Sequence, residues 1–230
     1  MRIYCHYGSN VITLDGPAGA GKSTIARLLA DRLGCEYLDT GALYRAVTLF
    51  LLTRSIGTTE EEKISMALKE CVVSLEGGKV FIDDRDVTQK IRSPEVDRAV
   101  SAYSALSAVR DFLLETQRRT AKGRKVVAEG RDMGSVVFPE ASFKFFLDAR
   151  VEVRAARRWE ELKARGEVIT FEEVKTQLSR RDELDSGREL SPLRVPEEAK
   201  VIDTSEKTVD EVIGEILAVM AGRRSCCYIE

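Results

Sequence analysis

The sequence has a single histidine, His6, and no apolar run near the ~18 residues of a membrane-spanning helix. Because one histidine near the amino end is a poor basis for general-base catalysis, phosphohistidine chemistry or a zinc site, we exclude these three functions. Arginine, lysine and carboxylate side chains must carry any chemistry. We also expect no association with membranes.

The five cysteines lack the spacing of a metal site, and an odd number does not fit a disulfide framework. The first ten residues lack the apolar core of a signal peptide. Both observations predict a cytoplasmic protein with free thiols. The cysteines are Cys5, Cys35, Cys71, Cys226 and Cys227.

Charge of neither sign is in excess, since 36 basic residues face 38 acidic ones in 230 residues. This balance argues against nucleic acid as a partner, and 43% hydrophobic residues is typical of a soluble globular protein. A chain of this length is sufficient for one large domain with small insertions.

Five short apolar segments alternate with longer amphipathic ones, which predicts an α/β fold with a parallel sheet. The expected strands are "VITLD" (11–15), "EYLD" (36–39), "KVVAE" (125–129), "FKFFLD" (143–148) and "KVID" (200–203). Residues 71–84 predict a β-hairpin that turns at Gly77 and Gly78, as a small antiparallel insertion on the main sheet. In the arginine-rich region 154–187, Thr170 and Glu173 have the spacing of a helix capping box.

A phosphate-binding motif, G-x-x-x-x-G-K-[ST], follows the first expected strand and precedes a helix. Its glycines allow backbone N–H groups to surround phosphate oxygens, Lys22 reaches the β and γ phosphates, and Ser23 can ligate Mg²⁺. The alternative is a glycine-rich turn that only joins strand to helix, but the order strand, motif, helix favours nucleotide binding. We expect Lys22 to be an exposed loop residue. The expected ATP-binding residues are Gly16, Pro17, Ala18, Gly19, Ala20, Gly21, Lys22, Ser23 and Thr24.

The guanine-reading sequence N-K-x-D is absent, so a GTPase is not expected, and motor or assembly ATPases are usually larger. Small kinases that transfer the γ-phosphoryl group to a metabolite remain.

Arginines at helical spacing suggest how the acceptor is bound. Arg154, Arg157 and Arg158 share one helix face, and Arg181, Asp185 and Arg188 share another, unless Gly187 ends that helix first. A solvated face with local ion pairs is the alternative for each set.

Two further polar groups follow expected strands, where open α/β sheets bind ligands. "AEGRDMG" presents Gly130, Arg131 and Asp132. "LDTGALYRA" presents Thr40, Tyr44 and Arg45, although a helix cap and packing would explain Thr40 and Tyr44.

The segments "LDGPAGAGKST", "LDTGALYRA", "AEGRDMGSVVFP", "FFLDA" and "RRDELDSGRELSPL" resemble the bacterial-type cytidylate kinases of the nucleoside monophosphate (NMP) kinase family. The resemblance extends from Val11 to about Met220, and "GRDMG" is more specific than the P-loop alone. Glu129 and Ser135 stand where the family often has Asp and Thr.

The resemblance implies a P-loop NTPase domain over residues 11–220, with a five-stranded parallel sheet and tails at 1–10 and 221–230. Within it, the core would comprise residues 11–58, 121–152 and 188–220. An NMP-binding insertion with an antiparallel hairpin would span about 59–120, and a short mobile lid about 153–187.

The implied reaction is ATP-dependent phosphorylation of CMP and dCMP by a monomer. Arg45, Arg131 and Arg188 would hold the acceptor phosphate, and Arg181 and Asp185 the ribose. Ser101, Arg110 and Asp132 would read the base, although pattern alone favours a plain helix surface for Ser101 and Arg110. Lys22, Arg131, Arg157 and Arg158 would act in catalysis.

This chemistry agrees with the scarcity of histidine. A phosphate monoester has its second pKa near ~6, so the acceptor oxygen is already ionised at neutral pH. Mg²⁺ would be held by Ser23, with Asp15 or Glu129 assisting through water. The alternatives are a kinase for a hydroxyl acceptor with Asp132 as its base, or a non-catalytic ATP-binding regulator.

Overall fold

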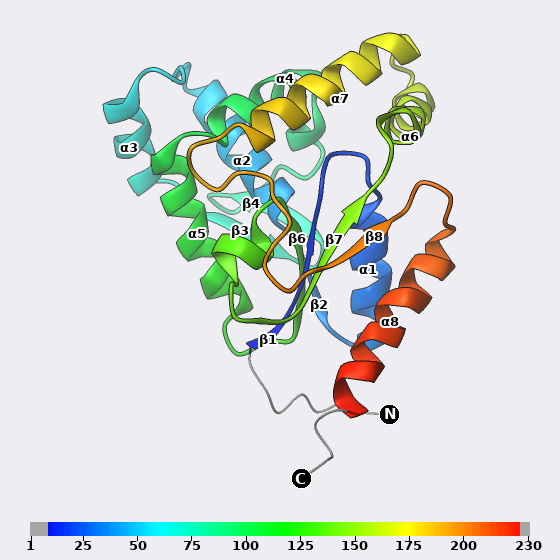
Figure 1. Ribbon diagram of the computed structural model, residues 1–230. Helices are drawn as coiled ribbons and strands as arrows, with labels where there is room; N and C mark the ends of the chain where they lie inside the picture. The colour runs from blue at the N-terminus through cyan, green and yellow to red at the C-terminus, as the bar shows by residue number, and fades with distance from the viewer. Residues whose placement is uncertain (1–8, 226–230) are drawn as a thin grey trace.

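The computed structural model describes residues 9–225, so most of the predicted amino-terminal tail and half of the carboxyl-terminal one, with Cys5, His6, Cys226 and Cys227, fall outside the described residues. Figure 1 shows a central sheet covered by helices on both faces, with one further helix across the carboxyl ends of its strands. The strands are β1 (Ser9–Asp15), β2 (Glu36–Asp39), β3 (Val73–Glu76), β4 (Lys79–Ile82), β5 (Arg85–Asp86), β6 (Val126–Gly130), β7 (Ala141–Asp148) and β8 (Lys200–Asp203). The α-helices are α1 (Lys22–Leu33), α2 (Thr40–Thr53), α3 (Glu61–Lys69), α4 (Pro94–Tyr103), α5 (Ser107–Ala121), α6 (Val151–Ala164), α7 (Phe171–Ser186) and α8 (Val209–Ser225), with a 3₁₀ turn η1 (Lys90–Arg92) and a π turn η2 (Met133–Val137).

The predicted five-stranded parallel sheet is confirmed. Its strand order is β2-β6-β1-β7-β8, and every neighbouring pair is parallel. All five expected strands are present, with β1 and β7 each starting two residues earlier than predicted. The crossover order places the carboxyl ends of β1 and β6 side by side, where the P-loop and the segment "GRDMG" begin.

Alternation along the strands divides the core into two layers, one on each face of the sheet. On β1, Val11 packs with α2 and α5, whereas Ile12 and Leu14 pack with α1 and α8. On β6, Val126 and Ala128 join the first layer and Val127 the second. A parallel sheet covered on both faces explains why its strands are continuous apolar runs.

The predicted hairpin is present, but its expected attachment to the main sheet is wrong. Strands β3 and β4 pair around Gly77 and Gly78, whose φ angles of +56° and +78° suit a tight hairpin turn. The short strand β5 then adds to β4, so the three form a separate antiparallel sheet. Its apolar side chains, including Val73, Val80 and Ile82, pack into the layer beside α2. Tertiary packing against this helix, rather than sheet hydrogen bonding, therefore joins the insertion to the rest of the molecule.

Helices α6 and α7 form a unit with a small core of its own. The predicted capping box is confirmed, because Thr170 Oγ1 accepts from the backbone N–H of Glu173 while the Glu173 carboxylate accepts from that of Thr170. Gly187 is the C-cap of α7, as predicted. Ala155, Leu162, Val174 and Leu178 form the shared core, and Ala18 of the P-loop packs with them. The helices are thereby attached to the P-loop.

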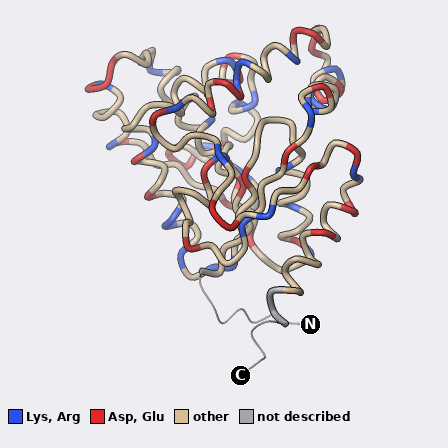
Figure 2. Tube along the Cα trace, in the orientation of Figure 1, with Lys and Arg blue, Asp and Glu red and all other residues tan. Residues whose placement is uncertain are grey.

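Charged residues of both signs are interspersed along the chain in Figure 2, in agreement with the balanced composition. Among residues 9–225, no helix is long and apolar enough to cross a membrane.

Candidate active site

The P-loop connects β1 to α1, and its glycines are required by close backbone approach. Gly16, Gly19 and Gly21 all have positive φ angles. A Cβ on Gly16 would lie 1.9 Å from the carbonyl oxygen of Leu147 on the neighbouring strand. The segment therefore has a fixed loop conformation that leads directly into the amino end of α1. A glycine-rich loop at a helix amino end is a geometry that binds phosphate.

Lys22 is buried at the start of α1, so the expectation that it is an exposed loop residue is wrong. Its ammonium group donates to the carbonyl oxygen of Pro17 at 2.6 Å. Burial, followed by the nearby Arg131, lowers its pKa to about 7. An arriving phosphate would favour the charged form of this lysine, because an opposite charge raises the pKa of an amine.

Of the two carboxylates considered beside Ser23, the structure brings only Glu129 to it. Ser23 Oγ donates to Glu129 Oε2 at 3.0 Å, and the Tyr37 hydroxyl donates to the other oxygen. Burial raises the pKa of Glu129. Asp15 is fully buried, and its two oxygens accept from the backbone N–H groups of Met133 and Gly134, each at 2.8 Å. Asp15 therefore holds the turn after β6.

At the start of α2, one residue caps the helix and others line the cavity. Asp39 is the N-cap of α2 and accepts from the N–H of Ala42, which corrects the alternative that Thr40 is the cap. The Thr40 hydroxyl donates to the carbonyl oxygen of Glu129 at 2.6 Å. Arg45 extends toward α4, where it forms an ion pair with Asp97 at 2.5 Å.

Asp185 is the centre of an arginine cluster. Its carboxylate, 1% exposed, pairs with Arg131 at 2.9 Å and with Arg188, and Arg181 Nε lies 3.9 Å away. Burial opposes ionisation of Asp185, but the three arginines together hold its pKa below the usual value. Burial, followed by Arg131, lowers the pKa of Arg181 to about 10. A cluster of several cations around one carboxylate is suited to an anionic ligand.

A second buried pair lies between α5 and the segment "GRDMG". Arg110 donates to the carboxylate of Asp132 and to the carbonyl oxygen of Ser104, the latter at 3.1 Å. Burial raises the pKa of Asp132, and the Arg110 guanidinium opposes that rise. The pair offers donors on one member and acceptors on the other. Gly130 precedes it, and a Cβ there would lie 2.9 Å from Thr40 Oγ1.

The three arginines of α6 have different partners, although they share one helix face. Arg154 is buried and bonds the carbonyl oxygens of Ala149 and Ala18 and the carboxylate of Asp182. Arg157 donates to Thr204, at 2.6 Å to its carbonyl oxygen and 3.1 Å to its hydroxyl. Arg158 pairs with Asp97 and Glu161. The interpretation of this face as merely solvated is therefore wrong for Arg154.

A single cavity of about 710 Å³ brings most of these groups together, and its size suits nucleotide-sized ligands. It is lined by P-loop residues from Ala18 to Thr24, by Glu129 and Gly130, and by Arg157 and Arg158 of α6, which were predicted to act on the transferring group. The predicted acceptor residues that line it are Thr40, Tyr44, Arg45, Arg110, Arg131, Asp132, Arg181, Asp185 and Arg188. Gly16, Pro17, Asp15 and Ser101 are not among the lining residues, whereas Val100 on α4 and Ser104, its C-cap, are.

Several lining residues were not predicted. Thr204 follows β8, and its hydroxyl donates to the carbonyl oxygen of Ala20 in the P-loop. The rule that ligands lie beyond the carboxyl ends of strands would have found it, had it been applied to the last strand. Arg92 lines the cavity from η1, and no sequence pattern singles it out.

A P-loop facing an arginine-rich cavity, at the carboxyl edge of a five-stranded parallel sheet, defines a small P-loop kinase. A gluconokinase from Sinorhizobium meliloti 1021 shares this fold at 17% identity, with a TM-score of 0.51 and coverage of 98% of each chain. The family described as cytidylate kinase matches residues 12–221, and the chain belongs to it. The chain is 49% identical to a cytidylate kinase of Caldanaerobacter subterraneus subsp. tengcongensis, covering 89% of this chain and 92% of that protein. It is 46% identical to one of Carboxydothermus hydrogenoformans, covering 93% and 98%.

Proposed function

We propose that this protein transfers the γ-phosphoryl group of ATP to CMP and dCMP, forming CDP and dCDP. Membership of the cytidylate kinase family over residues 12–221 supports this reaction. The observation that carries it in the structure is one cavity with a P-loop on one side, and the arginine cluster and the pair Arg110–Asp132 on the other. Donor and acceptor nucleotides thus have separate binding groups within reach of each other.

On the donor side, the loop from Gly16 to Thr24 surrounds the triphosphate with the backbone N–H groups of all its residues except Pro17, and Lys22 neutralises charge on the β and γ phosphates. Arg157 lies beside this loop, since its guanidinium is 4.0 Å from the position of a Cβ on Gly21. Arg157 and Arg158, both on α6, act on the phosphoryl group that is being transferred.

On the acceptor side, Arg45, Arg131 and Arg188 bind the phosphate of the monophosphate, and Arg181 and Asp185 contact its ribose. Asp185 already binds Arg131 and Arg188. A carboxylate has about four acceptor sites, so a ribose hydroxyl can still donate to it. Thr40 and Tyr44 line the same side.

Arg110 and Asp132 read the base, whereas the assignment of Ser101 on the neighbouring helix α4 to the base stays a prediction, because Ser101 does not line the cavity. Cytosine presents an amino donor beside the acceptors N3 and O2, which match the carboxylate of Asp132 and the guanidinium of Arg110. Uracil instead presents an acceptor, O4, in place of the amino group and a donor at N3.

The reaction needs no residue that removes a proton, because the acceptor phosphate is ionised at neutral pH. The work of the protein is to offset repulsion between two anions, align them in line and exclude water. The arginines and Lys22 do the first. We assign alignment of the two anions and exclusion of water to closure of a lid, the region 153–187. The lid would close over the insertion, residues 59–120, and over the core, which comprises residues 11–58, 121–152 and 188–220.

A magnesium ion fits the donor set of this site. Ser23 Oγ and Glu129 Oε2 are hard oxygen donors in hydrogen-bond contact, beside the residues that we expect to bind the triphosphate. We assign the magnesium site to Ser23, with Glu129 assisting through water in preference to Asp15. When bound, the ion would offset charge on the donor phosphates.

An ADP-release assay with ATP, Mg²⁺ and CMP, dCMP, UMP, AMP, GMP, dTMP or shikimate tests the proposal. We expect CMP and dCMP to give the highest kcat/KM. Preference for shikimate would show a hydroxyl-acceptor kinase, and the absence of ADP release with every acceptor tested would support a non-catalytic ATP-binding regulator. We further propose that the protein acts in the cytoplasm and that it is a monomer. Sedimentation at assay concentration would check the monomeric state.

A further inference from the structure

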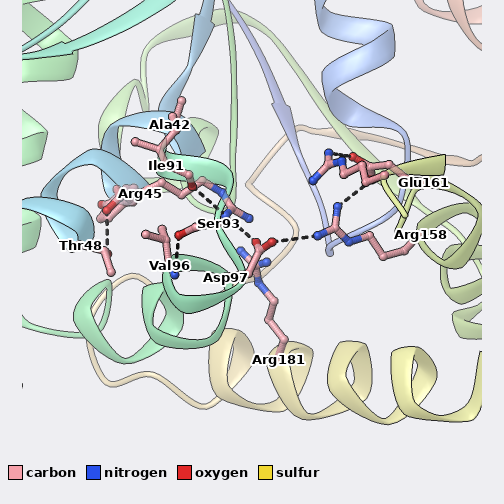
Figure 3. A network of polar contacts seen from close by, with 12 residues as sticks. Ala42, Arg45, Thr48, Ile91, Ser93, Val96, Asp97, Arg158, Glu161 and Arg181 are labelled. Carbon is pink, nitrogen blue, oxygen red and sulfur yellow. Dashed lines mark hydrogen bonds and ion pairs between the residues drawn. The ribbon is translucent and has the colours of Figure 1, made fainter. Parts of the chain in front are cut away.

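Asp97 on α4 lies between two cavity-facing arginines that come from different parts of the chain. Its Oδ1 pairs with Arg45 Nη1 of α2 at 2.5 Å, and its Oδ2 pairs with Arg158 Nη2 of α6 at 3.1 Å. Figure 3 shows both ion pairs, with Arg181 pointing toward the same carboxylate from α7. One side chain thus faces arginines from three helices.

Asp97 contacts two arginines that line the cavity, Arg45 and Arg158, but does not itself line it. The three side chains are 19% to 23% exposed, so water screens these ion pairs less than it would on an open surface. Two guanidinium groups near one another repel, and a carboxylate between them offsets that repulsion while fixing where each one points.

We propose that Asp97 is a positioning residue that couples the acceptor site to the lid by orienting Arg45 and Arg158 together. The inference rests on the proposed function for the roles of these two arginines, in which Arg45 binds the acceptor phosphate and Arg158 acts on the transferring group. Through Arg45, Asp97 supports binding of CMP. Through Arg158, it supports the chemical step or the closure that precedes it.

A simpler role for Asp97 would be helix stabilisation, because it lies in the first turn of α4 and acidic groups are favourable at that end of a helix. Glu95 lies in the same turn, is exposed, and has no hydrogen bond or ion pair among the residues that the structure describes. Glu95→Gln therefore removes the same charge from the same turn without touching either arginine.

Steady-state kinetics with Asp97→Asn, Asp97→Glu and Glu95→Gln test the coupling. We expect Asp97→Asn to raise KM for CMP and lower kcat, each by about tenfold, with KM for ATP within about twofold. Asp97→Glu should recover part of both losses, because it restores the carboxylate. Wild-type values in Asp97→Asn, or the same changes in Glu95→Gln, would overturn the proposal.

A double-mutant cycle separates coupling from an independent effect. If Asp97 acts on kcat through Arg158, then Asp97→Asn should lower kcat much less in an Arg158→Ala background than in the wild type. Losses in kcat that multiply fully in the double variant would contradict action through Arg158.

Hydrogen exchange of the ligand-free protein supplies a readout that does not depend on turnover. Asp97→Asn should increase exchange at α6 relative to Glu95→Gln, because one contact between α4 and α6 is lost. Equal exchange in both variants would overturn the link between these helices. If the wild type fails to phosphorylate CMP while this difference in exchange is present, the proposed function fails and the link remains.

Discussion

At the scale of single residues, burial changes what the charged groups of this site can do. Lys22, Asp132 and Asp185 are at least nine-tenths shielded from water, and each has a polar partner. In such surroundings an unpaired charge is costly, so changes at these residues should act through charge and pairing rather than through lost packing alone.

Lys22→Met should abolish phosphoryl transfer with the fold retained, because methionine keeps most of the buried stem and removes the ammonium group, with its charge and its hydrogen bond to the Pro17 carbonyl oxygen. We expect kcat to fall by about 10²-fold or more, the usual effect of losing a group that neutralises transition-state charge. Turnover at saturating ATP and a circular dichroism melt check the two halves of this prediction. Near-normal kcat would remove the P-loop lysine from the mechanism.

Asp132→Asn should weaken discrimination between CMP and UMP. Facing uracil, the wild-type pair leaves buried groups unpaired at about 1 to 3 kcal/mol each, so kcat/KM should favour CMP by about 10² or more. An asparagine amide can donate to the uracil O4, so the ratio should shrink. Measuring kcat/KM for both nucleotides in both proteins checks this, and an unchanged ratio would contradict the assignment of Asp132 to the base.

At the scale of elements, the P-loop and helix α6 are joined by several contacts. Arg154 bonds the carbonyl oxygen of Ala18, and a Cβ on Gly19 would lie 3.0 Å from the Cβ of Arg154. Arg157 reaches Thr204, which in turn bonds Ala20. Helix α6, which we propose belongs to the lid, is therefore packed and hydrogen-bonded against the P-loop backbone.

Arg157→Ala should lower kcat with a smaller change in KM for CMP, because Arg157 lies on the donor side of the cavity. A decrease of about tenfold or more in kcat is expected for a group that interacts mainly in the transition state. Initial rates with CMP varied at saturating ATP measure the two effects. A large increase in KM with unchanged kcat would place Arg157 in the acceptor site.

Two glycine substitutions should shift stability in opposite directions. Gly16→Ala should destabilise the fold by about 2 kcal/mol or more, because its Cβ would overlap the backbone of β7 and its φ of +144° is unfavourable for alanine. Gly214→Ala, inside α8 with nothing within 4 Å of the new Cβ, should stabilise by about 0.5 to 1 kcal/mol. Urea unfolding of both variants measures the difference, and a stable Gly16→Ala protein would refute the close approach.

At the scale of the whole molecule, the arginine cluster links stability to pH. Asp185 belongs to α7, Arg131 follows β6, and Arg188 follows α7, so their contacts join α7 to the sheet. The folded protein lowers the pKa of Asp185 below its unfolded value of ~3.9. The stability gained is therefore fully present above that unfolded pKa and is lost as pH falls through the folded one.

Asp185→Asn should reduce the free energy of unfolding by about 3 kcal/mol at neutral pH, because it leaves three partly buried arginines without their buried carboxylate partner. Its difference from the wild type should shrink as pH falls below about 4. Denaturant unfolding at several pH values checks the trend. Val212→Ala, which removes buried methyl groups and no titratable one, should give a difference that does not change with pH, and parallel behaviour of both variants would contradict the linkage.

The sequence by itself determined the features that depend on neighbouring residues. The five parallel strands, the P-loop, the capping box of Thr170 and Glu173, and the stop at Gly187 all follow from short-range patterns of burial, hydrogen bonding and backbone freedom. The family was also recognisable from contiguous motifs.

Only the tertiary structure decided which distant side chains meet. Asp15 and Glu129 both lie near the carboxyl ends of buried strands and look equivalent in sequence, yet Asp15 holds the turn after β6 and Glu129 contacts Ser23. The antiparallel sheet stands apart from the main one, and Arg157 and Arg158 have partners in different elements. The link through Asp97 joins α2, α4 and α6. Such pairings depend on how helices and sheets pack across long separations in the chain, and no local pattern of residues encodes that packing.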